Sequence, residues 1–218
     1  MGAFDHIVLV NLVFLLIQWV RGWVADPITG PFIQLPLNTS NFHIQKPYDL
    51  PVWERYSFVN GIHKLWVYST DNPLSKNSPT KPRTEVMIKG YNYSSNVWQF
   101  EGYGYVPSGT SGVSIMQVFG ASPPHPTTLQ LRIYNGSLTY YTSAVLVPNI
   151  YDKWFRVNVI HDVELSRIKI YIDGKFRYEE PGRGGTFHYF KFGVYGQMND
   201  SYYMESRWKD IKVFKKCN

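Results

Sequence analysis

The nine residues YFKFGVYGQ, at positions 189–197, decide the fold of this chain. The run is rich in aromatic residues and is strand-like, with no helical spacing of its apolar positions. Successive side chains of a strand point to opposite faces, so Lys191 and Tyr195 lie on one face. Because a lysine and a tyrosine share this strand face, the run predicts a ligand-binding site in addition to a strand of a sheet.

Two shorter strand-like runs, RTEVM at 83–87 and QVF at 117–119, also carry polar side chains inside a strand pattern. The alternation places Arg83 on the same face as Glu85, and Gln117 on the same face as Phe119. Arginine, glutamine, lysine and tyrosine that converge on one sheet face form a site for a ligand with a carboxylate. We therefore predict a carboxylate-binding face built from three strands.

Strand signals continue along most of the chain. Asn-Gly at 135–136 and Asp-Gly at 173–174 are signals for tight hairpins, and no window of 11 residues has a 3.6-residue apolar period. We predict an all-β, single-domain jelly roll, a concanavalin-like sandwich of two antiparallel sheets with a concave ligand face. The expected strands are 42–45, 64–69, 84–91, 97–106, 113–120, 129–134, 137–142, 154–161, 167–172, 187–195 and 204–214.

Composition agrees with a sandwich and limits the partners. The chain has 218 residues, of which 44% are hydrophobic, 17% aromatic and 17% charged. This is enough for a real core, and it excludes a disordered chain. The net charge of +6 suits an anionic partner. The basic residues are scattered, and together with a secretory address this argues against nucleic acid.

The first residues predict a secretory signal peptide. Residues 7–20 are almost continuously apolar, and small residues follow at Gly22 and Ala25. We expect residues 1–25 to be removed; a signal anchor is the alternative, but a span needs about 20 apolar residues. Nothing later could cross a membrane. The predicted location is the secretory pathway, either outside the cell, in its wall, or in the vacuole.

Other local features fit that route. After the signal peptide we predict an N-terminal arm at residues 26–55 and the jelly-roll domain at residues 56–218. Cys217 is the single cysteine, so an intrachain disulfide is excluded. Separately, we expect the protein to be a monomer. Four sequons predict a glycoprotein: Asn38-Thr39-Ser40, Asn92-Tyr93-Ser94, Asn135-Gly136-Ser137 and Asn199-Asp200-Ser201.

The three runs resemble the signature strands of polysaccharide lyase family 7 and the related glucuronan lyases. The third run matches at six positions, with Phe192 in place of alanine. The first matches at 83–85, with Met87 in place of the closing arginine, and the second matches at 117–118. Phe119 stands where the family has histidine. The resemblance implies the alginate-lyase-type jelly roll.

Three segments are similar to a citrate-binding-protein-like branch of this superfamily in plants. They are PRTEV at 82–86, VWQFEGYGYVP at 97–107 and QVFGA at 117–121. In that branch Phe119 is the normal residue. The resemblance as a whole extends from Trp66 to the C-terminus.

The resemblance implies roles for the site residues. Lyases of this family neutralise a uronate carboxylate with arginine and glutamine before β-elimination. Arg83 and Gln117 match those positions, and the other residues expected to bind ligand are Glu85, Lys191 and Gln197.

The resemblance makes Tyr195 the catalytic tyrosine, which serves as an acid and sometimes also as the base. Phe119 cannot accept a proton. Glucuronan lyases use a histidine from another strand, and His63 is the candidate counterpart here; the alternative is that His63 is a surface turn residue. Tyrosine, with an unperturbed pKa of about 10, is a poor base unless a cation such as Lys191 lowers it.

Two main functions follow. The chain binds a small polycarboxylate such as citrate, with Arg83, Lys191 and Gln117 as the clamp. Alternatively it is a lyase that cleaves an acidic oligosaccharide or polysaccharide such as glucuronan or alginate, with Trp98 or Tyr103 as sugar platforms. A specialised metabolic enzyme that reuses the tyrosine and histidine is a third reading. The histidines show no metal-ligand spacing, so we predict neither metal nor cofactor.

Overall fold

A computed structural model describes residue 26 and residues 28–216, so the predicted signal peptide and Cys217 lie outside the described residues. A compact unit begins at Phe32. Its elements, in chain order, are β1 Phe32–Leu35, η1 Thr39–Asn41, β2 Phe42–Gln45, η2 Val52–Glu54, β3 Tyr56–Val59, β4 Ile62–Tyr68, β5 Arg83–Ile88, β6 Val97–Tyr105, β7 Val113–Phe119, β8 Thr127–Tyr134, β9 Ser137–Tyr140, β10 Ala144–Val147, β11 Trp154–Asp162, β12 Arg167–Ile172, β13 Lys175–Pro181, β14 Tyr189–Gly196 and β15 Tyr203–Lys216.

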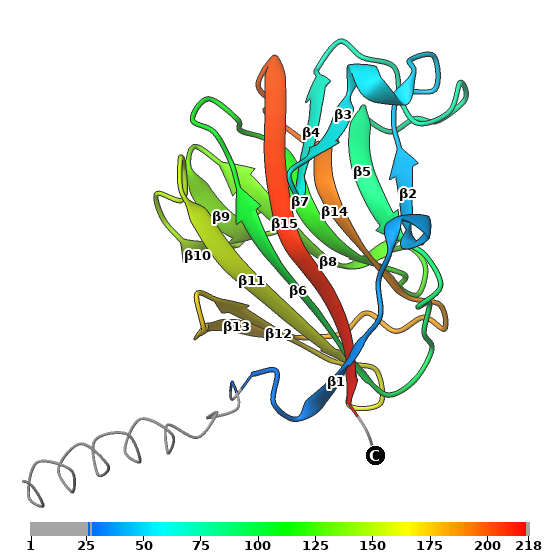
Figure 1. Cartoon of the computed structure of the whole chain (residues 1–218), viewed down its shortest axis with the longest axis vertical. Helices are drawn as coiled ribbons and strands as arrows, with labels where there is room; N and C mark the ends of the chain where they lie inside the picture. Colours follow the sequence, from blue (N-terminus) through cyan, green and yellow to red (C-terminus); the bar gives the residue numbers. More distant parts are fainter. Residues whose placement is uncertain (1–25, 27, 217–218) are drawn as a thin grey trace, which may run out of the picture. The chain divides into compact units, whose positions relative to one another are not determined.

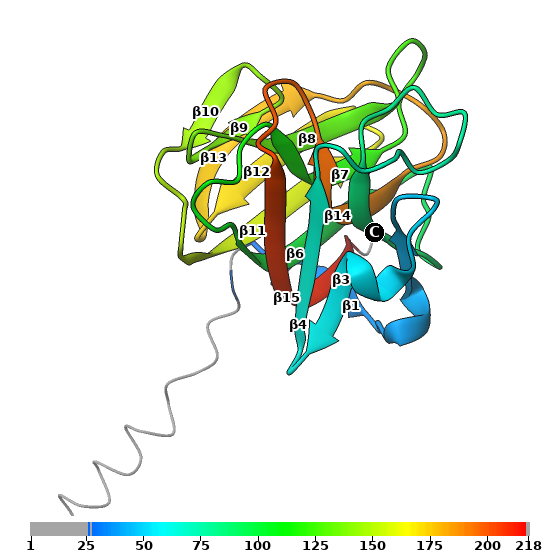
Figure 2. The same cartoon turned by 90° about the horizontal axis from the view of Figure 1, so that it is seen from above.

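The strands form two antiparallel sheets. Sheet A has the order β13-β12-β11-β6-β15-β4-β3, with β1 added to β15, and sheet B has the order β10-β9-β8-β7-β14-β5-β2. Neighbours in the sheets are often far apart in the sequence: β15, the last strand, lies between β6 and β4 (Figure 1). Seen from above, β15 lies next to β4 and β14 next to β7 (Figure 2). This is the predicted all-β jelly roll of two antiparallel sheets.

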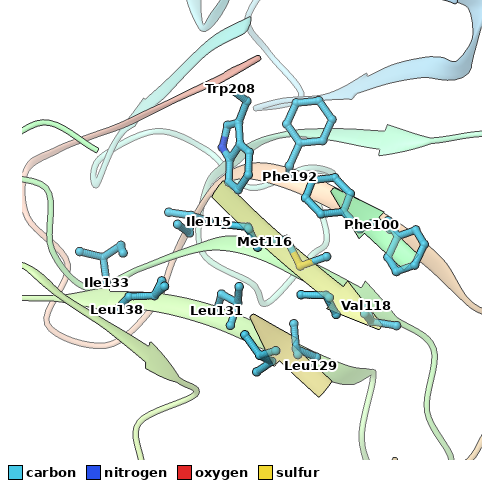
Figure 3. Packing of buried hydrophobic residues seen from close by; sticks show 14 of the residues in the cluster. Phe100, Ile115, Met116, Val118, Leu129, Leu131, Ile133, Leu138, Phe192 and Trp208 are labelled. Carbon is cyan, nitrogen blue, oxygen red and sulfur yellow. The ribbon is translucent and has the colours of Figure 1, made fainter. Parts of the chain in front are cut away.

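Alternation explains why a strand such as β12 has one buried face. In β12, Ile168, Ile170 and Ile172 are fully buried, while the two residues between them are partly exposed. The buried faces of the two sheets meet in one core. There Trp208 of sheet A packs against Phe192 of sheet B, with ring centroids 5.7 Å apart (Figure 3). Burial of this apolar surface is the main term that stabilises the unit.

The predicted hairpins are confirmed. Asn135 and Gly136 join β8 to β9 with φ values of 49° and 81°. Asp173 and Gly174 join β12 to β13 with values of 53° and 73°. Positive φ at both central residues produces the turn whose twist matches that of paired strands.

The differences from the prediction lie at the sheet edges. Sequence patterns did not single out β1, β3, β10 or β13, and three of these are the terminal strands of a sheet. An edge strand has one neighbour and is partly exposed, so its apolar pattern is weak; β13 has no buried residue. The arm expected at 26–55 contains β1 and β2, which pair with β15 and β5.

Candidate functional site

The outer face of sheet B, which points away from the core, carries the candidate site. The three strands that hold the sequence motifs, β7, β14 and β5, are adjacent in this sheet. Their register sets Lys191 opposite Gln117 on one side and Tyr195 opposite Arg83 on the other. Sheet pairing therefore brings together residues that are far apart in the sequence, by 74 positions for Lys191 and Gln117 and by 112 for Tyr195 and Arg83.

Glu85 is the centre of this cluster. Its carboxylate accepts a hydrogen bond from Lys191 Nζ at 2.5 Å and a short one from Gln117 Nε2. Arg83 Nη1 lies 3.4 Å from the same carboxylate. Glu85 is 0% exposed, and Gln117 and Lys191 are each 1% exposed. The four residues form one buried, hydrogen-bonded unit with two positive charges and one negative charge.

Burial and pairing act in opposite directions on Lys191. Desolvation lowers the pKa of Lys191, while the Glu85 carboxylate beside it raises that pKa. The ammonium group of Lys191 is enclosed and already bound to Glu85, so Lys191 holds the Glu85 carboxylate and is not exposed at the surface of the sheet. In the predicted clamp Lys191 held a ligand carboxylate directly; the structure shows it bound to Glu85 instead, and its contact with a ligand stays a prediction.

Arg83 is the cation of the cluster that reaches the surface. Its side chain is 12% exposed, against 2% for the side chain of Lys191. The guanidinium carbon lies 3.7 Å from the centroid of the Tyr195 ring, which is a cation–π geometry. Arg83, and not Lys191, is therefore the cation in contact with the predicted catalytic tyrosine.

Two buried polar atoms at this cluster have no hydrogen-bond partner in the described part of the chain. They are Nε of Arg83 and Oε1 of Gln45, and Gln45 is the β2 residue that pairs with Glu85. Unpaired buried polar groups are rare in folded proteins. Arg83 and Gln45 thus keep hydrogen-bonding capacity at the edge of the cluster.

A chain of amides extends the cluster across the sheet. Gln130 of β8 donates to Gln117 Oε1 at 3.1 Å, and Arg132 Nε donates to Gln130 Oε1 at 2.7 Å. Gln130 and Arg132 alternate in the sequence with Leu129, Leu131 and Ile133, which gives them the polar face of their strand, but this pattern does not assign them to the site. Their role depends on β8 lying next to β7, which the local pattern does not reveal.

Phe119 forms part of an apolar wall at the next position along β7. Its ring stacks on that of Tyr189, with centroids 4.7 Å apart. Burial raises the pKa of Tyr189 to about 12, and the charge of Glu85 adds to this shift. Phe119 also borders a cavity of about 470 Å³, which is lined by Phe119, Gly120, Ala121, Ser122, Pro123, Pro126, Gly185, Thr186 and Phe187.

The structure does not bring His63 to this face. His63 lies in β4 of sheet A, is 4% exposed, and packs edge-on against Phe192 and Phe42. Its Nδ1 is 2.8 Å from the hydroxyl of Tyr56. Desolvation lowers the pKa of His63 to about 4. Neither a surface turn nor the predicted catalytic position fits, because the β4 alternation points His63 into the core.

Three other predicted residues make no hydrogen bond to the Glu85 cluster in the described part of the chain. Gln197 follows β14 and donates from Nε2 to the carbonyl of Tyr195 at 3.2 Å. Trp98 and Tyr103 belong to β6 of sheet A, so they cannot form sugar platforms on sheet B. Trp98 stacks on Tyr93 inside the fold, and Tyr103 lies under Lys209.

The part of the chain that the structure describes, residue 26 and residues 28–216, also limits what the site can be. No group of three histidine, cysteine, aspartate or glutamate side chains is arranged to hold a metal ion among them. No helix in this part of the chain is long and apolar enough to cross a membrane.

Comparison with known proteins adds sequence and fold relatives. Residues 35–215 match the family model described as alginate lyase. The citrate-binding protein of Hevea brasiliensis is 54% identical over 195 residues, which are 89% of this chain and 81% of that protein. An alginate lyase of polysaccharide lyase family 7 has a TM-score of 0.60 at 16% identity, covering 84% of this chain and 92% of its own. A family 7 alginate lyase variant in complex with the substrate GGMG has a TM-score of 0.64 at 13% identity, covering 84% and 96%.

Proposed function

The chain belongs to the alginate lyase family, and we propose that the outer face of its sheet B binds an anionic ligand through a carboxylate held by Arg83. The observation that carries this proposal is the buried unit of Arg83, Glu85 and Lys191, which has a net charge of +1 before any ligand binds. Glu85 neutralises one cation, and Arg83 is the one that reaches the surface. A carboxylate beside Arg83 would balance the remaining charge.

The planar guanidinium group suits this role. Arginine binds a carboxylate through two parallel N–H donors, and such charge-assisted bonds are stronger than neutral ones. The stack on Tyr195 and the contact with Glu85 hold the group in place, so little side-chain entropy remains to be lost on binding. The relative from Hevea brasiliensis is named for citrate binding, and this supports a carboxylate ligand for the present chain.

Calorimetric titration with citrate, glucuronate and short oligouronates tests the proposal. We expect Arg83→Ala to weaken binding by about ten- to a hundredfold, because a hydrogen bond to a charged group is worth about 1.5–3 kcal/mol. Arg167→Ala is the matched control, since Arg167 lies on sheet A and its side chain is 50% exposed. No measurable heat with any of these acids, or equal affinities for the two variants, would reject the proposal.

A lyase is the second candidate function, and the contact of Arg83 with Tyr195 favours it. In β-elimination a base removes the proton next to the uronate carboxylate, the C–O bond to the leaving sugar breaks, and an acid protonates the departing oxygen. Phe119 cannot act as the base, and His63 lies inside the core. Tyr195 would therefore have to serve as both base and acid.

The lyase reading has a separate test. Incubation with glucuronan, alginate and pectate should release an unsaturated uronate, which absorbs in the ultraviolet. Tyr195→Phe should abolish that signal while the protein still binds citrate or uronate. If neither the parent protein nor Tyr195→Phe releases product, the protein is a binder only.

We also propose that the protein follows the secretory route and carries glycans. The asparagines of the four sequons, Asn38, Asn92, Asn135 and Asn199, are all exposed, which supports modification. Treatment of the protein from its native source with an N-glycosidase should lower its mass. An unchanged mass would contradict glycosylation.

A further inference from the structure

Two arginines on sheet B and its adjoining loop meet at one tyrosine ring. Arg132 extends from β8, and Arg183 comes from the segment between β13 and β14. Their guanidinium carbons lie 5.2 Å and 4.2 Å from the centroid of the Tyr141 ring. In the described part of the chain, neither arginine makes an ion pair with a carboxylate.

The pair therefore carries two positive charges with no carboxylate bound to them among the described residues. Two guanidinium groups that share one ring repel each other, and a nearby anion would relieve the repulsion. Neutral oxygens orient one of them: Arg132 donates to Gln130 Oε1 at 2.7 Å and to the hydroxyl of Tyr134 at 3.3 Å. These bonds fix the plane of the group, which is what two-point recognition of an anion requires.

This pair lies on the same face as the Glu85 cluster. Arg132 donates to Gln130, Gln130 donates to Gln117, and Gln117 donates to Glu85. All of the bonds run in one direction, so the carboxylate at one end and the guanidinium at the other determine the orientation of both amides. Arg132 thus lies at one end of a single hydrogen-bonded chain of side chains, and Arg83, in contact with Glu85, lies at the other end.

The sheet register gives their separation. Arg83 pairs with Tyr195, Tyr195 with Ser114, and Ser114 with Arg132. Strands lie about 4.8 Å apart, so three spacings place the backbones of Arg83 and Arg132 about 14 Å apart. Tyr195 lies on the row between them.

We propose that Arg132 and Arg183 form a second anion-binding site, which holds another acidic group of the ligand whose first carboxylate binds Arg83. The inference rests on the proposed function, because it takes the Arg83 site as its first anchor. It selects a ligand whose acidic groups are on the order of 10–14 Å apart along an extended backbone. Citrate carries its carboxylates on a three-carbon chain, so a citrate held at Arg83 cannot reach the second site.

Binding measurements with a length series test this inference. The probes are citrate, uronate monomers and oligouronates of two to five residues, titrated against the parent protein, Arg83→Ala and Arg183→Ala. We expect Arg183→Ala to change the affinity for the monomer by less than twofold and to weaken that for the longer oligouronates at least fivefold. Arg83→Ala should weaken binding of both.

Arg183→Ala is the primary variant because Arg183 is not part of the amide chain, and Arg132→Met provides a second variant. Thermal unfolding of each variant confirms that it is folded, and Arg167→Ala again serves as the control. If Arg83→Ala weakens binding while Arg183→Ala and Arg132→Met weaken neither ligand class, or weaken both equally, the second site is rejected and the first one stands. If Arg83→Ala has no effect on any ligand, the proposed function fails and the bridging ligand fails with it.

Discussion

Replacing Glu85 by glutamine separates the structural and binding roles of the central cluster. The carboxylate is fully buried and contacts Lys191, Gln117 and Arg83. Glu85→Gln keeps the size and shape of the side chain and removes its charge. The side chain of Lys191 is only 2% exposed, and its ammonium group then has no anionic partner.

The expected cost is large. Removing one partner of a buried ion pair leaves an uncompensated charge, which destabilises a protein by about 3–5 kcal/mol. Lys191 can avoid this only by releasing its proton, and burial already lowers its pKa. Releasing the proton at pH 7 also costs free energy, because a lysine in the unfolded chain has a pKa of about 10.4.

Urea unfolding at pH 7 measures this cost. With a slope of about 2 kcal/mol/M, the midpoint should fall by about 1.5–2.5 M. Lys191→Met should also be destabilising, while the double variant Glu85→Gln/Lys191→Met should recover at least 2 kcal/mol relative to the sum of the single changes. Additive effects, or a loss below about 1 kcal/mol for Glu85→Gln, would refute this account of the cluster.

The pH dependence of Glu85→Gln provides a further check. Without Glu85, the pKa of Lys191 in the folded state falls further below its unfolded value. Between these two pKa values the unfolded state binds more protons than the folded state, so stability rises with pH. We therefore expect Glu85→Gln to regain stability between pH 7 and pH 10, and the parent protein to regain less.

Three further predictions concern other parts of the molecule. Burial lowers the pKa of His63 to about 4, whereas the histidine of the unfolded chain accepts its proton near pH 6.5. Through this residue the parent protein should lose about 2 kcal/mol of its free energy of unfolding between pH 7 and pH 5, and His63→Phe should not show that loss. An equal loss for both proteins in urea unfolding at the two pH values would contradict this. A Cβ on Gly193 would lie 2.4 Å from the carbonyl oxygen of Thr84, whereas one on Gly61 would meet nothing within 4 Å. Gly193→Ala should therefore lower the free energy of unfolding by at least twice the ~1 kcal/mol expected for Gly61→Ala in the same assay. Equal losses would be inconsistent with the close approach of β14 to β5. Phe119→His supplies an imidazole beside Gln117 and should raise ultraviolet-detected lyase activity at least tenfold; a folded variant that shows no gain would mean that more than a base is missing.

The pattern of the sequence predicted most of the strands for a simple physical reason. A strand that lies between two others in a sandwich buries alternate residues, and its sequence then carries a clear period of two. The strand expected at 167–172 coincides with β12, which lies between β13 and β11. Strands at the edges, such as β13 with no buried residue, lack that signal.

Residue types and spacing also indicated the members of the site, but not which of them a ligand can reach. Lys191 and Arg83 are both cations at motif positions, and nothing in their own strands distinguishes them. Burial does so: one side chain is 2% exposed and bound to Glu85, and the other is 12% exposed and stacked on Tyr195. Likewise His63 occupies a plausible position in the sequence, yet β4 lies in the opposite sheet.

The sequence alone therefore determined a two-sheet β fold with Arg83, Glu85, Gln117, Lys191 and Tyr195 on strand faces that could converge. Only the tertiary structure decided that β7, β14 and β5 are neighbours, that Glu85 neutralises Lys191, and that Arg132 joins the same polar chain. The reason is that alternation is a local property, set by each strand's own backbone, whereas strand order and burial depend on pairings between segments far apart in the chain.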